Sequence, residues 1–139
     1  MWFIVMLFFS ALNSYADSQD APIIDQIINI RLENQLSELR EDPILTQTAR
    51  KYALTLVTEG SLRHRDDSGH GAAYRVQQEG GDYWTVGEIL GAGPTVDQIL
   101  HGWMKSASHR KVILTSKWTR IGWGIAPYEQ GYVMVILFA

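Results

Sequence analysis

Four short motifs between His64 and Gly124 constrain this chain more than any other feature of its sequence. His64 is followed five residues later by Gly69, and a glutamate lies in the segment GEIL at 87–90. The segment WMKSASHRKVIL then covers 103–114, and IGWG covers 121–124. Any one of these motifs is too short to be informative alone. Four of them in a fixed order are a strong signal for one kind of domain.

In order and spacing, these motifs resemble the core of the CAP (SCP) superfamily of cysteine-rich secretory, antigen 5 and pathogenesis-related 1 proteins. Its bacterial members typically read HxxxxG, GEN, WMxSxxHRxxIL and IGVG. The matching positions are His64, Gly69, Glu88, Trp103, Met104, Ser106, His109, Arg110, Ile113, Leu114, Ile121, Gly122 and Gly124. Upstream, the family's N-terminal arginine and helix-core places are held by Arg31, Leu36, Leu39, Leu45, Ala49 and Ala53. The resemblance therefore covers nearly the whole mature chain and is to the bacterial type of the family.

Three positions depart from the family's pattern. Ile89 stands where GEN has asparagine, Trp123 lies inside the IGVG-like segment, and Ile28 replaces an asparagine three residues before the arginine. The resemblance implies an α+β fold, a three-layer α-β-α sandwich around an antiparallel sheet. The expected order of elements, with helices first and a hairpin last, is typical of such layers.

The first 16 residues have the pattern of a signal peptide. An apolar run from Trp2 to Leu12 precedes Ser14 and Ala16, which are the small residues that a signal peptidase reads. The alternative is an uncleaved anchor, but the run is shorter than the about 20 residues that span a bilayer. We therefore predict cleavage after Ala16, a single domain at 17–139 with no transmembrane segment, and export to the periplasm or the exterior.

Composition agrees with a small exported domain. The chain has no cysteine, so neither disulfides nor a lipid-modified cysteine is available, and 46% hydrophobic residues must supply the stability through a core. A net charge of −3 argues against a general nucleic-acid-binding protein. HExxH and GxSxG are also absent, so zincin-type and serine-hydrolase chemistry has no local support.

Two helices are expected in the first half of the domain. Ile24, Ile28, Leu32, Leu36 and Leu39 recur at helical spacing, which predicts a first helix that ends near Arg40. A second helix is predicted from the cap signal Asp42–Pro43 to Gly60, with an apolar face made of Leu45, Ala49, Tyr52, Ala53 and Leu56. Residues 61–81 are polar and glycine-rich and predict a long structured loop.

The second half alternates between strands and helices. Residues 83–90 are strand-like, and Thr95 with Gln98 forms a capping box that opens a helix. Ser106 or Ser108 is expected to cap a further short helix that presents His109. The runs 118–126 and 132–138 predict a β-hairpin, whose first strand places glycines and alanine on one face, where a helix can approach closely.

His64, Glu88 and His109 are the candidate site residues, because the resemblance implies that they meet in one cleft. Two histidines and a carboxylate can bind Zn²⁺ or another divalent metal, with His64 and His109 as ligands and Glu88 as an alternative third. Without metal, the carboxylate would instead raise the pKa of a histidine. His70 and Ser106 are expected at the rim, and Ser106 occupies the place of a second glutamate in eukaryotic relatives.

Each site residue also has a simpler interpretation. His64 could pair with Asp66 or Asp67 at the surface, and His109 could belong to an exposed basic turn. Glu88 lies in an apolar segment, where an unpaired carboxylate is costly, so we expect a partner for it. That partner is either a histidine or ion, or an arginine or backbone amide that merely fixes the loop.

Three functions follow from these alternatives. The first is a secreted binding module whose cleft holds a divalent metal or small ligand and whose partner is an extracytoplasmic ligand or protein, a lipid among the candidates. The second is a metal-assisted hydrolase that uses Glu88 as its catalytic base. The third is a structural or interaction module in which the polar residues brace the loop 61–81 without metal.

Overall fold

The computed structural model describes residues 23–139, so the predicted signal peptide lies outside the described residues. After a helix at 23–33, the chain forms β1 (Arg40–Glu41), α2 (Pro43–Glu59), α3 (Ala72–Gln78), β2 (Gly87–Gly93), α4 (Val96–Lys105), α5 (Ala107–Ile113), β3 (Arg120–Tyr128) and β4 (Gly131–Phe138). Within the described part of the chain, no helix is long and apolar enough to cross a membrane.

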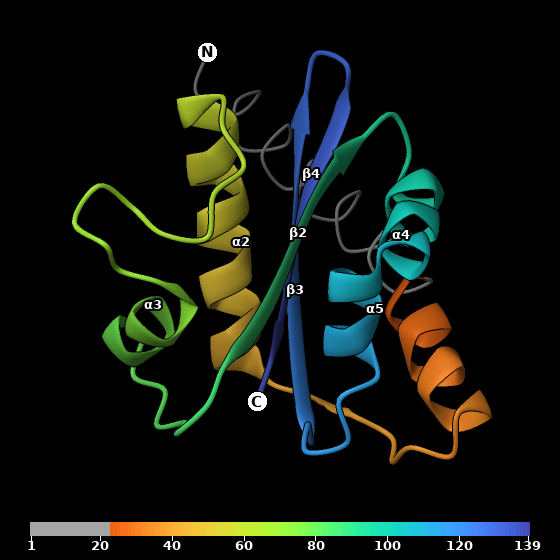
Figure 1. Ribbon diagram of the computed structural model, residues 1–139. Helices are drawn as coiled ribbons and strands as arrows, with labels where there is room; N and C mark the ends of the chain where they lie inside the picture. Colours follow the sequence, from red (N-terminus) through yellow and green to blue (C-terminus); the bar gives the residue numbers. More distant parts are fainter. Residues whose placement is uncertain (1–22) are drawn as a thin grey trace, which may run out of the picture.

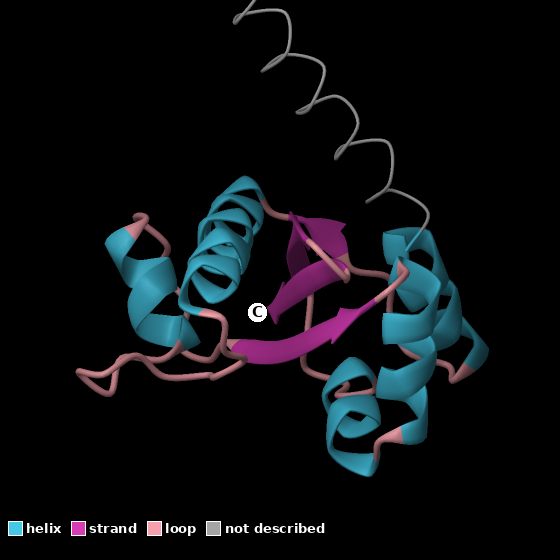
Figure 2. Ribbon diagram, turned by 90° about the horizontal axis from the view of Figure 1, so that it is seen from above, coloured by secondary structure: helices cyan, strands magenta, loops and turns pink. Residues whose placement is uncertain are grey.

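These elements form the predicted sandwich (Figure 1). The sheet has the order β1-β3-β4-β2; its three long strands are antiparallel, while the two-residue β1 runs parallel to β3. Figure 2 shows α2 and α3 on one side of the sheet and α4, α5 and the helix 23–33 on the other. The α+β prediction is therefore confirmed, with the addition of one parallel edge pair that two residues are too few to reveal in a sequence.

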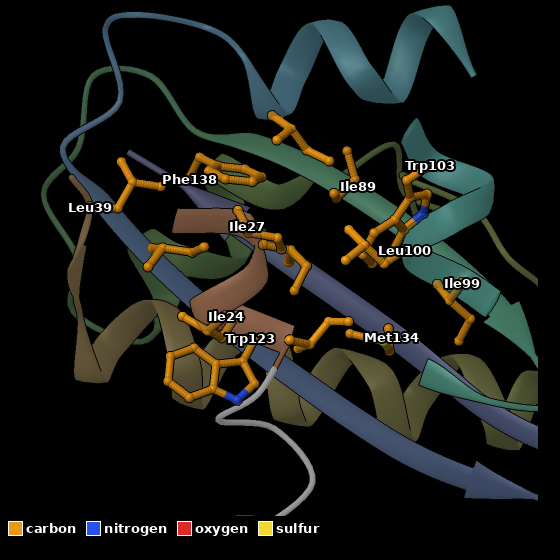
Figure 3. Close-up of a cluster of buried hydrophobic side chains, with 14 of the residues drawn as sticks. Ile24, Ile27, Leu39, Ile89, Ile99, Leu100, Trp103, Trp123, Met134 and Phe138 are labelled. Atoms are coloured by element: carbon orange, nitrogen blue, oxygen red, sulfur yellow. The ribbon is translucent and has the colours of Figure 1, made fainter. Parts of the chain in front are cut away.

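The sheet separates two apolar clusters, as expected for a layer buried on both faces. On the side of α4 and α5, β2 and β4 contribute Ile89 and Ile136 to a cluster with Trp103 (Figure 3). On the side of α2, Leu90 and Val135 pack in a second cluster. The alternation of neighbouring strand residues between the two clusters follows from the two-residue period of a strand.

Helix α2 begins and ends as its sequence predicts. The Asp42 side chain accepts hydrogen bonds from the backbone of Ile44 and Leu45, and Gly60 ends the helix in the left-handed conformation. The helix lies very close to β3, because a Cβ on Gly122 would be 2.3 Å from a backbone atom of Leu45. The face of β3 that carries glycines and an alanine therefore lets a helix approach closely, as predicted.

The first helix differs from its prediction. It ends at residue 33 rather than near Arg40, and Gln35 then adopts the left-handed conformation with φ 62°. Leu32, predicted on the buried face, is half exposed, while Arg31 is fully buried. The Arg31 guanidinium donates to carbonyl groups of the α5 end and of neighbouring loops, and these contacts outweigh the apolar spacing on which the prediction rested.

The later helices follow their cap signals. Thr95 accepts a hydrogen bond from the backbone N–H of Gln98 at the start of α4. Ser106 is the N-cap residue of α5, although its side chain makes no capping hydrogen bond. The strand predicted at 83–90 begins only at Gly87, which pairs with Phe138 at the end of β4, and the hydroxyl of the preceding Tyr83 donates to the Asp42 carboxylate.

Candidate functional site

Glu88 is the most buried charged group of the candidate site. It is the second residue of β2, where it pairs in register with Leu137 of β4, and its side chain is only 5% exposed. One carboxylate oxygen lies 2.8 Å from His64 Nδ1, and the other lies 2.5 Å from Arg75 Nη2. The predicted need for a partner is therefore met twice, by a histidine and by an arginine.

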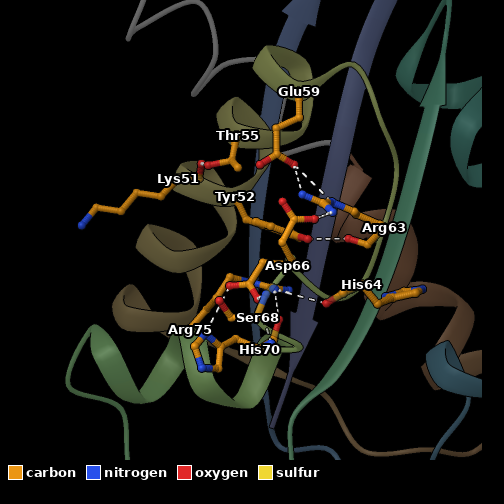
Figure 4. Close-up of polar contacts among 11 residues, drawn as sticks. Lys51, Tyr52, Thr55, Glu59, Arg63, His64, Asp66, Ser68, His70 and Arg75 are labelled. Atoms are coloured by element: carbon orange, nitrogen blue, oxygen red, sulfur yellow. Dashed lines mark hydrogen bonds and ion pairs between the residues drawn. The ribbon is translucent and has the colours of Figure 1, made fainter.

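The loop that carries His64 is fixed by α2 and α3 (Figure 4). The Tyr52 hydroxyl of α2 donates to the carbonyl of Arg63, the residue before the histidine. Arg75 of α3 donates through Nη1 to the carbonyl groups of His64, at 3.2 Å, and His70, at 3.4 Å. The histidine is thus held through its side chain and its backbone.

Arg75 connects the parts of this site. Its guanidinium carbon lies 3.4 Å from the centre of the Tyr52 ring, a cation–π contact, while its Nη2 pairs with Glu88. Burial raises the pKa of Tyr52, so this phenol stays neutral and able to donate. Tyr52 was predicted only as a core residue; the need of a buried tyrosine hydroxyl for a partner was the signal that could have placed it here.

The environment of His64 favours its charged form. The hydrogen bond to Glu88 raises the pKa of His64 above its ordinary value of 6.5, although partial burial and the nearby Arg75 act in the opposite direction. Because Nδ1 is engaged by the carboxylate, the ring presents Nε2 on its other edge, and the side chain is 59% exposed. A partly exposed imidazole with one nitrogen free can accept a proton or bind a ligand.

His109 has a similar arrangement on the other side of β2. It belongs to α5, which packs against β2, and its Nδ1 lies 2.7 Å from the Ser106 hydroxyl oxygen. Ser106, predicted at the rim of the site, thus contacts His109 directly. As in His64, the nitrogen that remains free is Nε2.

The structure brings together His64 with Glu88 and, separately, His109 with Ser106. Within residues 23–139, no three histidine, aspartate or glutamate side chains lie in a group that could hold a metal ion. The described residues therefore offer fewer than three such ligands at any one place, so a metal ion bound there would need further ligands, such as water.

The simpler partners suggested for His64 are engaged elsewhere. Asp66 accepts from the backbone of Ser68 and His70 and pairs with the His70 ring at 3.2 Å, which closes a tight turn. The His70 ring also stacks on Tyr74 at 3.7 Å between centroids. The ring of His70 therefore contacts Asp66 and Tyr74.

Comparison with known proteins agrees with this fold. The sequence profile of the cysteine-rich secretory protein family (CAP) matches residues 24–138. An outer surface protein of Borrelia burgdorferi has a similar structure, with a TM-score of 0.82 at 21% identity over 87% of this chain and 91% of that one.

Two further relatives are longer proteins. An extracellular SCP-domain protein of Bacillus anthracis has a TM-score of 0.77 at 21% identity and is matched over 88% of this chain but 40% of its own. The Bacillus subtilis protein YkwD, described as uncharacterized, is 29% identical over 96 residues, which are 68% of this chain and 37% of that protein. This chain therefore corresponds to less than half of each of these two proteins.

Proposed function

The chain belongs to the cysteine-rich secretory protein (CAP) family, and from this premise we propose that it is an exported binding module with a two-histidine metal site. In this proposal, Nε2 of His64 and Nε2 of His109 bind one divalent ion such as Zn²⁺ past β2, which is an edge strand and so leaves its outer side open. Water or a small ligand fills the other positions. Export is supported by relatives described as an outer surface protein and an extracellular protein.

The observation that carries the proposal is the 2.8 Å hydrogen bond between His64 Nδ1 and Glu88. Histidines that bind metals through one nitrogen almost always donate the other N–H to a carboxylate, a carbonyl or water. The carboxylate fixes the tautomer and makes the free nitrogen a better ligand. Glu88 then orients the ligand His64 rather than binding the ion itself.

The contact between Arg75 and Glu88 favours a metal-binding role for this site over a hydrolytic one. A general base needs a free oxygen within hydrogen-bond reach of the proton that it removes. Both Glu88 oxygens are engaged, one by His64 and one by the strong charge-assisted contact with Arg75. The side chain is also nearly fully buried, so water reaches it poorly.

Calorimetric titration of Zn²⁺ into metal-free protein that begins at residue 17 tests the proposal. We expect stoichiometric binding that is lost in His64→Ala and in His109→Ala, with His101→Ala as the matched control because His101 is an exposed histidine outside the site. Binding that survives both substitutions would contradict the proposal. So would folded protein that binds no divalent ion.

A structural role is the second candidate, and the contacts of Arg75 favour it. This one side chain ties the carbonyl groups of His64 and His70 to Glu88 on the sheet. A pure brace predicts that His64→Ala lowers the unfolding temperature by the same amount with and without Zn²⁺. A metal site predicts that Zn²⁺ raises the unfolding temperature of the unsubstituted protein only.

A further inference from the structure

The charges of this chain are distributed very unevenly. Residues 98–128 contain five of the 12 lysines and arginines and none of the 15 acidic residues. The rest of the chain therefore carries all of the negative charge, and the net value of −3 conceals a positive segment. This segment includes α5 and most of α4.

Three of these cations border one hollow of about 700 Å³ where α4 joins α5. Lys105, Arg110 and Lys111 are all exposed at its edge. Met104 and Leu114 contribute apolar, partly buried surface to the same hollow, which Thr115 also lines. The hollow thus combines a cationic rim with an apolar lining.

The rim cations have no partner among the described residues. Elsewhere in residues 23–139 the pattern is different, since Lys51 pairs with Glu79 and Arg63 pairs with Glu59 and Asp67. The side chains of Lys105, Arg110 and Lys111 take part in no ion pair or hydrogen bond within that same part of the chain. Their charges are therefore available to an external anion.

A simpler role for these cations would be to complement the dipole of α5. Cations are favourable at the C-terminal end of a helix, where carbonyl groups lack partners. In this protein, however, the buried guanidinium of Arg31 already donates to the carbonyl groups of Ile113 and Thr115, at 2.8 Å each. Arg31 thus supplies a cation at this helix end from inside the protein, so the exposed cations are not needed as hydrogen-bond partners for these two carbonyl groups.

We propose that this basic hollow binds the phosphate-bearing headgroup of an anionic phospholipid at a membrane surface. Lysine and arginine are the side chains that recognise phosphate, and basic clusters are drawn to anionic leaflets. Met104 and Leu114 distinguish a lipid from a free phosphate, because apolar surface beside the cations suits the carbon atoms that follow a headgroup. The site is separate from the His64–Glu88 pair and does not depend on metal binding.

Co-sedimentation with vesicles tests the proposal, using the chain from residue 17, which contains every described element. We expect binding to phosphatidylglycerol–phosphatidylcholine vesicles and not to phosphatidylcholine alone. Each cation near an anionic surface contributes about fivefold in affinity. Lys111→Gln should therefore lose about fivefold, and Lys105→Gln with Lys111→Gln about 25-fold. Lys51→Gln, which removes the same charge on the α2 side, should bind like the unsubstituted protein.

Three outcomes would overturn the proposal. The first is equal binding to vesicles with and without phosphatidylglycerol, and the second is an equal loss in Lys51→Gln, which would show an effect of net charge alone. The third is complete displacement from vesicles by inorganic phosphate at constant ionic strength, which would assign the hollow to a free anion. Far-ultraviolet circular dichroism of each variant confirms that the fold is unchanged.

Discussion

Replacing Arg31 should destabilise this protein more than any surface substitution. The side chain is fully buried, and it donates to four carbonyl groups, those of Ser37, Ile113, Thr115 and Trp118, at 2.8–3.4 Å. Burial lowers the pKa of Arg31, but the ordinary pKa of an arginine is so high that the group remains a cation at neutral pH. Among residues 23–139 no carboxylate pairs with Arg31, so within this part of the chain carbonyl dipoles stabilise its charge.

The magnitude follows from these contacts. Hydrogen bonds to charged groups contribute about 1.5–3 kcal/mol each, yet the cost of burying the guanidinium cancels much of their sum. Arg31→Ala removes the charge and its contacts, leaves unpaired carbonyl groups and opens a cavity, so we expect a loss of about 3–5 kcal/mol. A domain of this kind is stable by about 5–15 kcal/mol, so much of the total would be lost.

Urea unfolding followed by tryptophan fluorescence measures this loss. Arg31→Lys is the matched control, since it keeps the charge but cannot reach carbonyl groups on separate segments from one ammonium, and an intermediate loss of about 2 kcal/mol is expected. Arg31→Met keeps much of the volume without any donor. If Arg31→Met proved as stable as the unsubstituted protein, the carbonyl contacts would contribute nothing net and the reasoning would be refuted.

Four further predictions concern the sheet and the two histidines. Gly124→Ala would place a methyl group 2.4 Å from the backbone of Ala49, so urea unfolding should show a loss of about 1–3 kcal/mol or more. The hydrogen bond to Glu88 raises the pKa of His64 above 6.5, so the contact stabilises the fold fully below pH 6.5 and this contribution is lost as the pH rises through the raised pKa. The difference in unfolding free energy between the unsubstituted protein and His64→Asn should therefore shrink as the pH rises across this range. Zn²⁺ affinity should change in the opposite sense, rising with pH until His64 is neutral, which calorimetry at several pH values can follow. Ser106→Glu would give His109 a carboxylate partner, and stronger Zn²⁺ binding is expected. An unchanged Zn²⁺ affinity would show that His109 is not a ligand of the ion.

Local signals were sufficient to predict the elements whose ends depend on neighbouring residues. The caps at Asp42 and Thr95 each act within a few residues, and both lie where they were predicted. The hairpin also forms, with a shorter turn than expected, because β3 continues to Tyr128 and β4 begins at Gly131. The approach of α2 to the glycine face of β3 was also predictable, because a strand without side chains on one face leaves room for a helix backbone.

Contacts between distant residues could not be predicted in the same way. The apolar spacing of the first helix predicted that Leu32 would be buried, but three of the four carbonyl partners of Arg31 are 82, 84 and 87 residues away, and no local pattern indicates them. Similarly, the pairing of His64 with Glu88 came from the family resemblance, whereas the role of Arg75 between Tyr52 and Glu88 required the structure.

Helix α5 links the two proposed sites through opposite ends. Its first turn presents His109, and its last turn is held by Arg31 from inside the protein. Arg31 is the partner of the Ile113 and Thr115 carbonyl groups, while Arg110 and Lys111 lie exposed at the hollow. The same short helix therefore carries the histidine of one proposed site and two cations of the other, and the buried arginine holds its end in place for both.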